Sequence, residues 1–356
     1  MIKVLVYPKA TNPYQDQLYS GIDDKGIQVK YFYPFARLRF GLGFILLFLL
    51  LIKYRIQGYK IFHIHWFYEF QIYFTNNVFI KSFFTVYFIC AMTFIRVLGY
   101  KLVWTIHDLQ THDRQFINDL FVTRVICSLC NVKIIHSEET RHQLEVIHIN
   151  SVNIKFLPLG GYIEYYPNEI SLVEARRKMN IPEGNFVYIF FGRIEPYKGV
   201  LDLLETFKDL SLKDSSLIVA GPCDDQKLKD ALKQYENFPD IKIITEYVPD
   251  QDIQIFLNSA DVVVCPFKYI TNSSTVLLAG SFGKAVIAPL IGNIKDLPEE
   301  IGLFYNPQKV SLSDVLGTAY SRRNVMRSKG KTAYDYIKSI SWKDIADDLV
   351  KIYRSL

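Results

Sequence analysis

The sequence lacks the signatures of several common enzyme classes. It has no GxSxG, Walker A or HExxH motif, so it offers no hydrolase nucleophile elbow, P-loop or zincin site. The nearest approach to a GxGxxG fingerprint, Gly41–Leu46, has no third glycine and follows no predicted strand, which argues against a Rossmann-type oxidoreductase or epimerase. Long uncharged runs are also missing. Phe40–Ile52 and Ser82–Ile95 are shorter than the roughly 18–20 residues of a membrane-spanning helix, so neither is predicted to span.

Cysteine is scarce as well. The five cysteines are an odd number and lie mostly inside apolar segments, which is typical of reduced, buried thiols in a cytoplasmic protein. Cys127 and Cys130 form a CxxC pair without a second pair to complete a zinc site, so core packing is favoured over metal binding. No signal peptide is apparent before the first predicted strand, Ile2–Val6.

Apolar and aromatic side chains are abundant. Half of the 356 residues are hydrophobic, 15% are aromatic and 22% are charged, a balance that suits a folded chain of two domains. The formal net charge of +5 fits an anionic ligand or an anionic surface. It is too small to indicate nucleic-acid binding.

Strand-like and helix-like segments alternate along two stretches, 2–157 and 186–288. This alternation predicts parallel sheets covered by helices on both faces, hence an α/β protein of two Rossmann-like, doubly wound domains that face a cleft. The expected parts are a first domain (1–160), a linker (161–185), a second domain (186–335) and a C-terminal helix (336–356) that returns to the first domain.

The strongest motif is Gly192–Gly199, with the sequence GRIEPYKG. It follows the apolar run Phe186–Phe191 and leads into the amphipathic segment Val200–Leu210. Glycine lets a phosphate approach the backbone, and Arg193 and Lys198 supply charge-assisted hydrogen bonds. The alternative is a helix start with two solvated cations. We interpret the loop as a site for the diphosphate of a nucleotide sugar.

A second candidate phosphate site lies in the segment Lys268–Pro289. Asn272, Ser273 and Ser274 are helix-capping residue types, and a helix start with uncovered N–H groups binds phosphate. Taken alone, this pattern cannot be distinguished from an ordinary helix cap. It indicates a phosphate site only because the Gly192–Gly199 motif accompanies it. The DxD-like Asp250–Asp252 begins a predicted helix, where aspartates cap the N-terminus, and we expect that role rather than a metal site.

Polar residues also follow the predicted strands of the first domain. His63 and His65 alternate on one strand face, but no carboxylate or cysteine cluster accompanies them, so hydrogen-bonded histidines are favoured over a metal pair. His107 and Asp113 are placed to take a proton from an attacking hydroxyl, as inversion requires. The alternative is a set of turn or cap residues, among them Asp108. The catalytic candidates are His107, Asp108 and Asp113, and the acceptor-side candidates are Asn12, Tyr14, His65, Trp66 and His112.

The apolar segment Leu38–Tyr54 is bracketed by cations. An apolar helix flanked by Arg37, Arg39, Lys53 and Arg55 is typical of a protein that grips an anionic bilayer. The alternative is a helix buried between the sheet and the C-terminal tail.

These segments resemble the two-Rossmann-domain (GT-B) glycosyltransferases, because GRIEPYKG is similar to their G-R-x-x-x-x-K-G donor loop. More closely, the sequence resembles the bacterial exopolysaccharide β-mannosyltransferases of the xanthan-assembly type. The further segments that carry this resemblance are Thr11–Ile22, Phe62–Trp66, Val103–Asp113 and Val262–Pro289.

The resemblance implies a metal-independent hexosyltransferase of bacterial surface polysaccharide synthesis. A hexose would pass from a GDP- or UDP-sugar, as substrate and without a cofactor, to a lipid-linked glycan at the inner membrane face, with no nucleic acid involved. Its first domain would bind the acceptor and its second the nucleotide sugar, and His107 would lie close to the donor sugar. The implied donor-binding residues are Gly192, Arg193, Lys198, Glu246, Tyr247, Val248, Lys268, Asn272, Ser273, Ser274 and Thr275.

One departure from the superfamily concerns the mechanism. Retaining members usually carry two glutamates around the helix that precedes Gly283, and those positions are Ile270 and Leu278 here. Inversion is therefore favoured. A retaining transferase and a non-catalytic, membrane-docked relative remain the alternatives.

Overall fold

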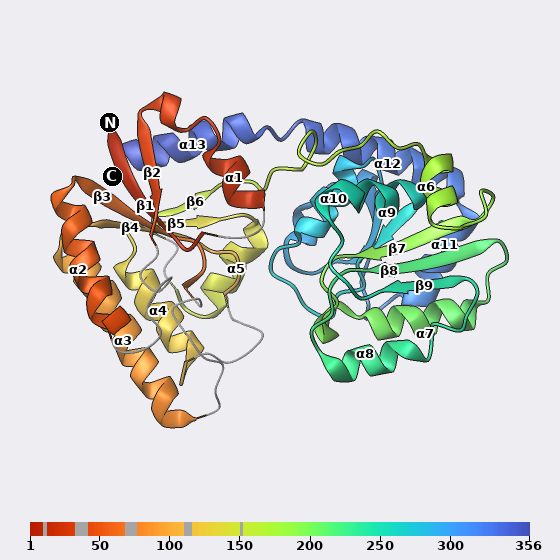
Figure 1. Cartoon of the computed structure of the whole chain (residues 1–356), viewed down its shortest axis with the longest axis horizontal. Coiled ribbons are helices and arrows are strands. Elements are labelled where there is room, and N and C mark those ends of the chain that lie inside the picture. The colour runs from red at the N-terminus through yellow and green to blue at the C-terminus, as the bar shows by residue number, and fades with distance from the viewer. Residues whose placement is uncertain (10–12, 33–41, 68–76, 110–115, 150–151) are drawn as a thin grey trace. The chain divides into compact units, whose positions relative to one another are not determined.

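The computed structural model describes residues 1–9, 13–32, 42–67, 77–109, 116–149 and 152–356. The chain divides into two compact units, each with its own parallel sheet (Figure 1). The first unit comprises Met1–Pro158 and Trp342–Leu356, and the second unit comprises Leu159–Ser341. The predicted architecture of two doubly wound α/β domains is confirmed.

The first unit has a sheet in which all described strand pairs are parallel, in the order β2-β1-β3-β4-β5-β6. Its strands are β1 (Ile2–Tyr7), β2 (Ile27–Tyr31), β3 (Tyr59–Ile64), β4 (Lys101–Thr105), β5 (Val132–Ile135) and β6 (Ile154–Phe156). Its helices are α1 (Pro13–Tyr19), α2 (Leu42–Ile56), α3 (Val78–Val97), α4 (Asp119–Leu129), α5 (Glu138–Val146) and α13 (Trp342–Arg354).

The second unit repeats this plan with the strand order β12-β11-β10-β7-β8-β9. Its strands are β7 (Phe186–Phe191), β8 (Ser215–Ala220), β9 (Ile241–Ile244), β10 (Val262–Val264), β11 (Ala285–Pro289) and β12 (Gly302–Tyr305). Its helices are α6 (Leu172–Lys178), α7 (Val200–Leu210), α8 (Gln226–Lys233), α9 (Ile253–Ser259), α10 (Ser274–Ser281), α11 (Leu312–Ser321) and α12 (Arg323–Lys338). β12 was not predicted, because its short sequence GLFY begins with glycine and is only partly buried.

The strand order of each sheet reverses once, and that point fixes where a ligand site can form. In the first unit β1 lies between β2 and β3, and in the second unit β7 lies between β8 and β10. Crevices in open α/β sheets open beyond the carboxyl ends of the strands at such switch points. The segments that follow β7 and β10 contain the two predicted phosphate motifs.

The expected linker, 161–185, is part of the second unit instead of a separate connection. It contains α6, on which Arg176 is fully buried and forms an ion pair of 2.6 Å with Asp261. Arg176 Nε also donates to the Ser259 carbonyl at 3.0 Å. The buried pair of Arg176 and Asp261 holds α6 against the core. The turn-rich sequence around α6 did not indicate this packing.

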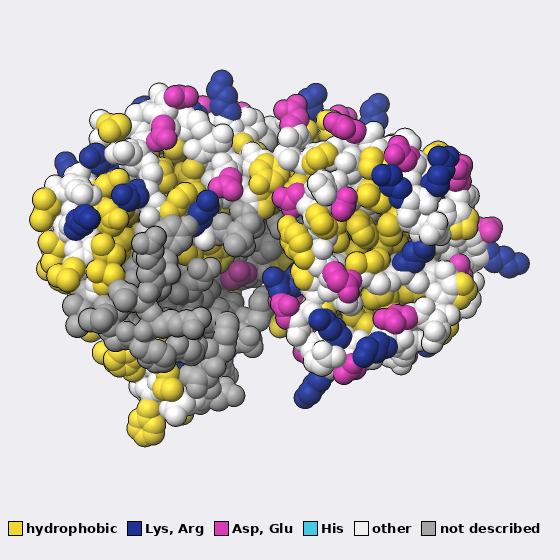
Figure 2. All heavy atoms as spheres, viewed as in Figure 1, with side chains coloured by type: hydrophobic (Ala, Val, Ile, Leu, Met, Phe, Trp, Pro, Cys, Tyr) yellow, Lys and Arg dark blue, Asp and Glu magenta, His cyan; other side chains and the backbone are white. Residues whose placement is uncertain are grey.

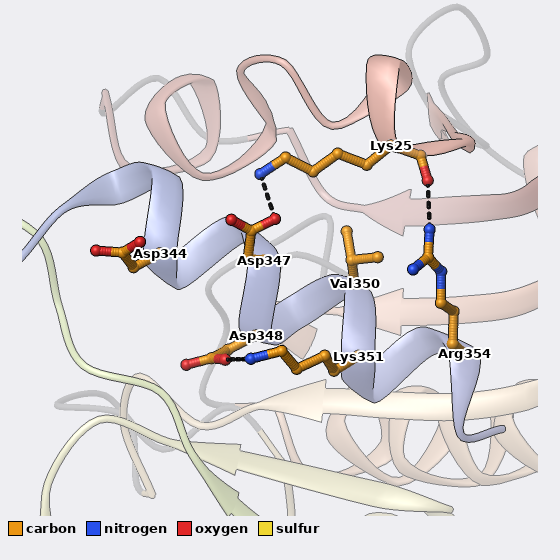
Figure 3. A pocket seen from close by; sticks show the side chains of 7 residues that line it. All are labelled: Lys25, Asp344, Asp347, Asp348, Val350, Lys351 and Arg354. Carbon is orange, nitrogen blue, oxygen red and sulfur yellow. Dashed lines mark hydrogen bonds and ion pairs between the residues drawn. The ribbon is translucent and has the colours of Figure 1, made fainter.

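The C-terminal helix α13 belongs to the first unit, whereas residues 336–341 stay with the second. Figure 3 shows the polar groove along its outer face. There Lys25 forms an ion pair of 2.8 Å with Asp347, and Arg354 donates to the Lys25 carbonyl at 2.9 Å. The C-terminal helix therefore belongs to the first unit, as predicted, but this segment starts at Trp342 and not at residue 336.

α3 is longer than the uncharged run Ser82–Ile95 that it contains. At 20 residues and a mean hydropathy of 1.9, it meets the length and composition of a membrane span, as core helices of soluble proteins also can. Its Phe88, Met92 and Ile95 are buried in the core. The length argument against a span therefore does not hold for this helix, although its second half is an ordinary core helix.

Candidate functional site

The GRIEPYKG loop begins directly at the end of β7, whose six residues are all buried. Gly192 has a φ of +123°, and a Cβ at this position would lie 3.6 Å from Thr275 Oγ1. Gly221, at the end of β8, lies so close that its own Cβ would be 2.2 Å from the Gly192 carbonyl oxygen. The loop after β7 and the start of α10 are thus brought together, as the two motifs predicted.

The two cations of this loop lie in different environments. Arg193 is half exposed and bonds the carboxylate of Asp224, which follows β8. Lys198 has only 15% of its side chain exposed, and its nearest carboxylate, Glu195, is 3.9 Å away. Burial lowers the pKa of Lys198, partly opposed by Glu195. A desolvated ammonium with such a distant partner gains strongly from a bound anion.

The start of α10 contains a buried hydroxyl. Ser273 occupies the N-cap position and is 3% exposed, and among the described residues its Oγ has no hydrogen-bond partner. Its backbone N–H is taken by Asn293 Oδ1 at 2.9 Å. The predicted side-chain cap is therefore not made, and the hydroxyl remains available beside the first N–H groups of the helix. Buried polar atoms without partners commonly mark ligand sites.

The remaining predicted donor residues divide by exposure. Lys268 forms an exposed ion pair of 2.9 Å with Asp202, and its backbone N–H donates to the Tyr197 carbonyl at 2.8 Å. Glu246 and Tyr247 are exposed. Val248 is instead a core residue, 7% exposed. A donor-binding role at this position stays a prediction, and the buried side chain of Val248 itself packs in the core.

The DxD-like segment does not cap a helix as expected. It forms a short 3-10 turn, and Asp252 precedes α9 without a side-chain cap bond. Asp250 instead accepts a hydrogen bond of 3.1 Å from the Tyr247 hydroxyl. Within the described parts of the chain, no three His, Cys, Asp or Glu residues group as ligands for a metal ion.

In the first unit, His107 follows β4 and is enclosed by aromatic rings. Trp66 stacks on it at 4.1 Å between ring centroids, and Tyr14 meets it edge-on at 4.9 Å. His107 Nε2 lies 3.2 Å from His65 Nδ1. Burial, with smaller contributions from His136 and His63, lowers the pKa of His107 well below its usual value. The imidazole is therefore neutral at neutral pH.

His63 and His65 are hydrogen-bonded histidines, as predicted. His63 is fully buried, with Nδ1 2.5 Å from the Tyr353 hydroxyl and Nε2 2.7 Å from Thr105 Oγ1. His65 Nε2 lies 2.8 Å from the Tyr19 hydroxyl. Cys127 and Cys130 are likewise buried free thiols, as expected of core residues.

Several predicted residues lie outside the part of the chain that the structure describes. They are Asn12, Arg37, Arg39, His112 and Asp113. Of the other predicted membrane cations, Lys53 is exposed. Arg55 is partly buried, and its Nε donates to the Leu98 carbonyl at 2.8 Å. This bond ties α2 to the end of α3, so Arg55 has a structural contact that the charge pattern did not suggest.

Sequence patterns missed several neighbours of the candidate sites. His136 follows β5, bonds the Leu157 carbonyl at 2.7 Å and lies 5.1 Å from His107 between ring centroids. Tyr353 comes from the far end of the chain. In the second unit, Asp224 could have been suspected, because it follows a strand that ends in glycine.

Comparison with known proteins shows which family the second unit is similar to. Residues 173–309 match the model described as "Glycosyl transferases group 1". The chain is 32% identical over 115 residues to the GDP-mannose:glycolipid 4-beta-D-mannosyltransferase of Xanthomonas campestris pv. campestris, a match that covers 32% of this chain and only about a third, 33%, of that relative.

Solved structures are similar to this chain over its whole length. Sucrose-phosphate synthase from Thermosynechococcus elongatus has a TM-score of 0.78 at 16% identity, covering 100% of this chain and 98% of its own. Anabaena HepE in complex with UDP has a TM-score of 0.74 at 14% identity, with 100% of both chains covered. The chain therefore has the GT-B fold, and its residues 173–309 are similar to the group 1 glycosyl transferases.

Proposed function

We propose that this protein transfers a hexose from a GDP- or UDP-sugar to a lipid-linked glycan acceptor, with inversion at the anomeric carbon. The relatives support the substrates. One is named for GDP-mannose and a glycolipid, and a structural neighbour was solved with UDP. The expected setting is bacterial surface polysaccharide synthesis at the inner face of the plasma membrane.

One observation carries the donor half of this proposal. The loop after β7 and the start of α10 converge at the switch point of the second sheet, where Gly192 lies against Thr275. The loop carries the poorly paired ammonium of Lys198, and the helix start carries the buried hydroxyl of Ser273. An anion at a helix N-terminus receives N–H bonds and the favourable end of the helix dipole.

The same groups serve the leaving diphosphate. Negative charge grows on the diphosphate as the glycosidic bond to the sugar breaks, and fixed positive groups lower the barrier by stabilising it. Arg193 and Lys198 fill this role in our proposal, in place of a metal ion. Asp250, within the DxD-like segment, is engaged by the Tyr247 hydroxyl.

Inversion is supported by what lies beside α10. Ile270 and Leu278, at the positions of the retaining glutamates, both pack against the hydrophobic core. An inverting reaction needs a base for the acceptor hydroxyl. His107 would become a buried cation on taking that proton, which the lowering of its pKa by burial disfavours, whereas a carboxylate becomes neutral when it takes a proton. We therefore assign the proton to a carboxylate, Asp108 or Asp113, and assign to His107 a hydrogen bond to a substrate hydroxyl.

A panel of nucleotide sugars, with and without a lipid-linked acceptor, tests the function. We expect one GDP- or UDP-hexose to release its nucleoside diphosphate only when the acceptor is present. Lys198→Met should weaken binding of the nucleoside diphosphate at least tenfold, because it removes a largely buried ammonium whose carboxylate partner, Glu195, is 3.9 Å away. The matched control is Lys233→Met, which removes an exposed lysine from a surface pair with Asp230 in the same unit. Equal affinities for the two variants would reject the assigned site.

The anomeric configuration of the product decides between the mechanisms. A β-linked product from an α-linked donor supports inversion, and an α-linked product supports the retaining alternative. If the protein binds a nucleotide sugar tightly but releases no nucleoside diphosphate with any acceptor, the result would support the non-catalytic alternative.

Membrane attachment is the second part of the proposal. The first half of α3 exposes apolar side chains, including Phe79 (85% exposed), Phe83 and Val86, and Ile117 and Phe121 are exposed beside α4. α3 and α4 contact each other, and the Ile117 N–H bonds Thr85 Oγ1. Hydrophobic side chains gather at the lower edge of the first unit in Figure 2. Aromatic side chains exposed in this way are typical of an interfacial membrane contact.

We therefore assign membrane contact to the start of α3 in addition to the cations near α2. Phe79→Ser/Phe83→Ser should reduce co-sedimentation with vesicles rich in anionic phospholipid at least fivefold. Phe238→Ser, an exposed aromatic of the second unit, is the control and should not change it. Unchanged partition of the double variant, or a dimer that dissociates on the same substitutions, would reject the membrane assignment.

A further inference from the structure

A continuous chain of hydrogen bonds links His107 to the C-terminal helix. His107 Nε2 lies 3.2 Å from His65 Nδ1, and His65 Nε2 lies 2.8 Å from the Tyr19 hydroxyl. The Tyr19 hydroxyl lies 3.1 Å from His63 Nδ1, which is also 2.5 Å from the hydroxyl of Tyr353 on α13. All five residues belong to the first unit.

The rings in this chain are neutral, so each has one N–H and one lone pair. Burial lowers the pKa of His63 to about 3 and lowers the pKa values of His65 and His107 well below the usual value. Burial also raises the pKa values of Tyr19 and Tyr353, which keeps both phenols protonated. Assigning one hydrogen bond of a neutral imidazole therefore assigns the whole ring.

The distances select one arrangement of these hydrogens. Nδ1 of His63 has a single lone pair, and Tyr353 reaches it at 2.5 Å, whereas Tyr19 is 3.1 Å away. With Tyr353 donating there, His63 carries its hydrogen on Nε2 and donates to Thr105. Two acceptors then remain for Tyr19, the Tyr353 hydroxyl at 3.4 Å and His65 Nε2 at 2.8 Å, and we assign its hydrogen to the shorter contact with His65.

The rest of the chain follows from that bond. His65 accepts at Nε2, so its hydrogen is on Nδ1 and points to His107 Nε2. His107 must accept there and must carry its hydrogen on Nδ1. We propose that Tyr19 is a positioning residue that fixes His107 as the Nδ1–H tautomer, and that Tyr353 secures this by occupying His63.

The catalytic meaning of this tautomer rests on the proposed function. Fixed in this state, with Trp66 stacked on the ring, His107 presents an N–H donor at Nδ1 and uses its only lone pair within the chain. It can then donate to a substrate oxygen but cannot accept the acceptor's proton. The C-terminal helix would thereby take part in the reaction without touching substrate.

Nitrogen NMR of the full-length protein with ¹⁵N-labelled histidine tests the tautomer directly. The His107 signals are assigned by their loss in His107→Gln. We expect a protonated Nδ1 and an unprotonated Nε2 in the wild type. In Tyr19→Phe the donor to His65 is gone, so the His65–His107 bond should reverse and most of the His107 hydrogen should move to Nε2. In Tyr353→Phe, Tyr19 is shared between two rings, and intermediate His107 shifts are expected.

Tyr100→Phe is the matched control. It removes a buried hydroxyl of the same unit that donates to the Leu51 carbonyl at 2.7 Å, away from the chain. It should leave the His107 shifts unchanged, and tryptophan fluorescence checks that each variant is folded. A wild-type His107 protonated on Nε2, or His107 shifts that Tyr19→Phe leaves unaltered, would overturn the proposal.

Kinetics supply an independent measurement. Tyr19→Phe should lower kcat at least tenfold and leave the donor KM within threefold, because the donor diphosphate site lies in the second unit. A donor KM that rises in parallel with the fall in kcat would contradict a positioning role. If the wild type transfers no sugar, the proposed function fails, while the nitrogen shifts still decide the tautomer.

Discussion

Gly199→Ala is the sharpest test of how the donor loop is built. Gly199 ends the turn that holds Lys198 and begins α7, with a φ of +72°. A Cβ at this position would lie 2.1 Å from the Pro266 carbonyl oxygen, at the end of β10. Because that atom belongs to the backbone, it cannot rotate away. The loop or the strand end must therefore move.

The expected cost has two parts. A left-handed backbone costs a non-glycine residue about 1–2 kcal/mol, and relief of overlap in a packed region costs about 1–3 kcal/mol. We expect Gly199→Ala to lower the free energy of unfolding of the second unit by about 3 kcal/mol, or its Tm by roughly 10 °C. Nucleoside diphosphate affinity should also fall, because Lys198 moves with the turn.

Two other glycines separate these causes. Gly26 has a φ of +78° and Gly184 has no left-handed φ, and neither Cβ would meet another described atom within 4 Å. Gly26→Ala should therefore cost only the backbone strain, about 1–2 kcal/mol. Gly184→Ala should change stability by less than about 0.5 kcal/mol.

The assay can assign each loss to its unit. The three tryptophans of the chain, Trp66, Trp104 and Trp342, all lie in the first unit. Urea unfolding followed by tryptophan fluorescence therefore reports the first unit, and far-ultraviolet circular dichroism reports both. Gly199→Ala should shift the part of the dichroism transition that fluorescence does not see. A Gly199→Ala protein within about 0.5 kcal/mol of the wild type would refute the steric argument.

Three further predictions concern the second unit. Arg176→Met removes the closer of two arginines from the buried Asp261 carboxylate and leaves Arg327 at 3.6 Å, which should cost about 3–5 kcal/mol in urea unfolding. Lys178→Met, from an exposed pair, should cost less than about 0.5 kcal/mol. Burial lowers the pKa of Lys284 from 10.5 to about 8. Between these two pH values the unfolded chain binds more protons than the folded chain, so the free energy of unfolding rises with pH. We expect a rise of up to about 3 kcal/mol across the pH range of about 8–10.5, relative to Lys284→Met. A flat difference between the two proteins would contradict this. Val248→Ala should cost about 1–2 kcal/mol but leave nucleotide affinity within twofold, as measured by calorimetry, because the side chain packs in the core.

The second unit was largely predictable, because its site is local in sequence. The segment Phe186–Leu210 contains, in order, a buried strand, a glycine, two cations and a helix. Each of these can be predicted from the residues that form it. What escaped prediction there depends on partners from elsewhere. Asp224 pairs with Arg193 across 31 positions, and Asn293, 20 positions away, takes the N–H of Ser273. The burial of Val248 could not be predicted, because the sequence does not show whether its side chain faces the core.

The first unit was predictable in fold but not in the wiring of its histidines. His63 and His65 could be recognised as hydrogen-bonded side chains, because alternation along a strand places both on one face. Their partners could not be named. Tyr353 lies 290 positions from His63 and comes from a helix that returns to this unit after the whole of the other. The packing of α13 against α1 and the contacts of Asp347 and Arg354 with Lys25 bring it there.

Both candidate sites nevertheless follow from one property of the sheets. In each unit the strand order reverses beside the first strand, between β1 and β3 and between β7 and β10. Helices leave such a point toward opposite faces, so the strand ends there remain uncovered. His65 and Trp66 follow β3, as the donor loop follows β7. The chemistry of the chain is thus located by topology. Motif spacing predicted the two proposed donor segments, because each is a short continuous stretch of the chain, whereas the tautomer proposed for His107 depends on residues far apart in the sequence.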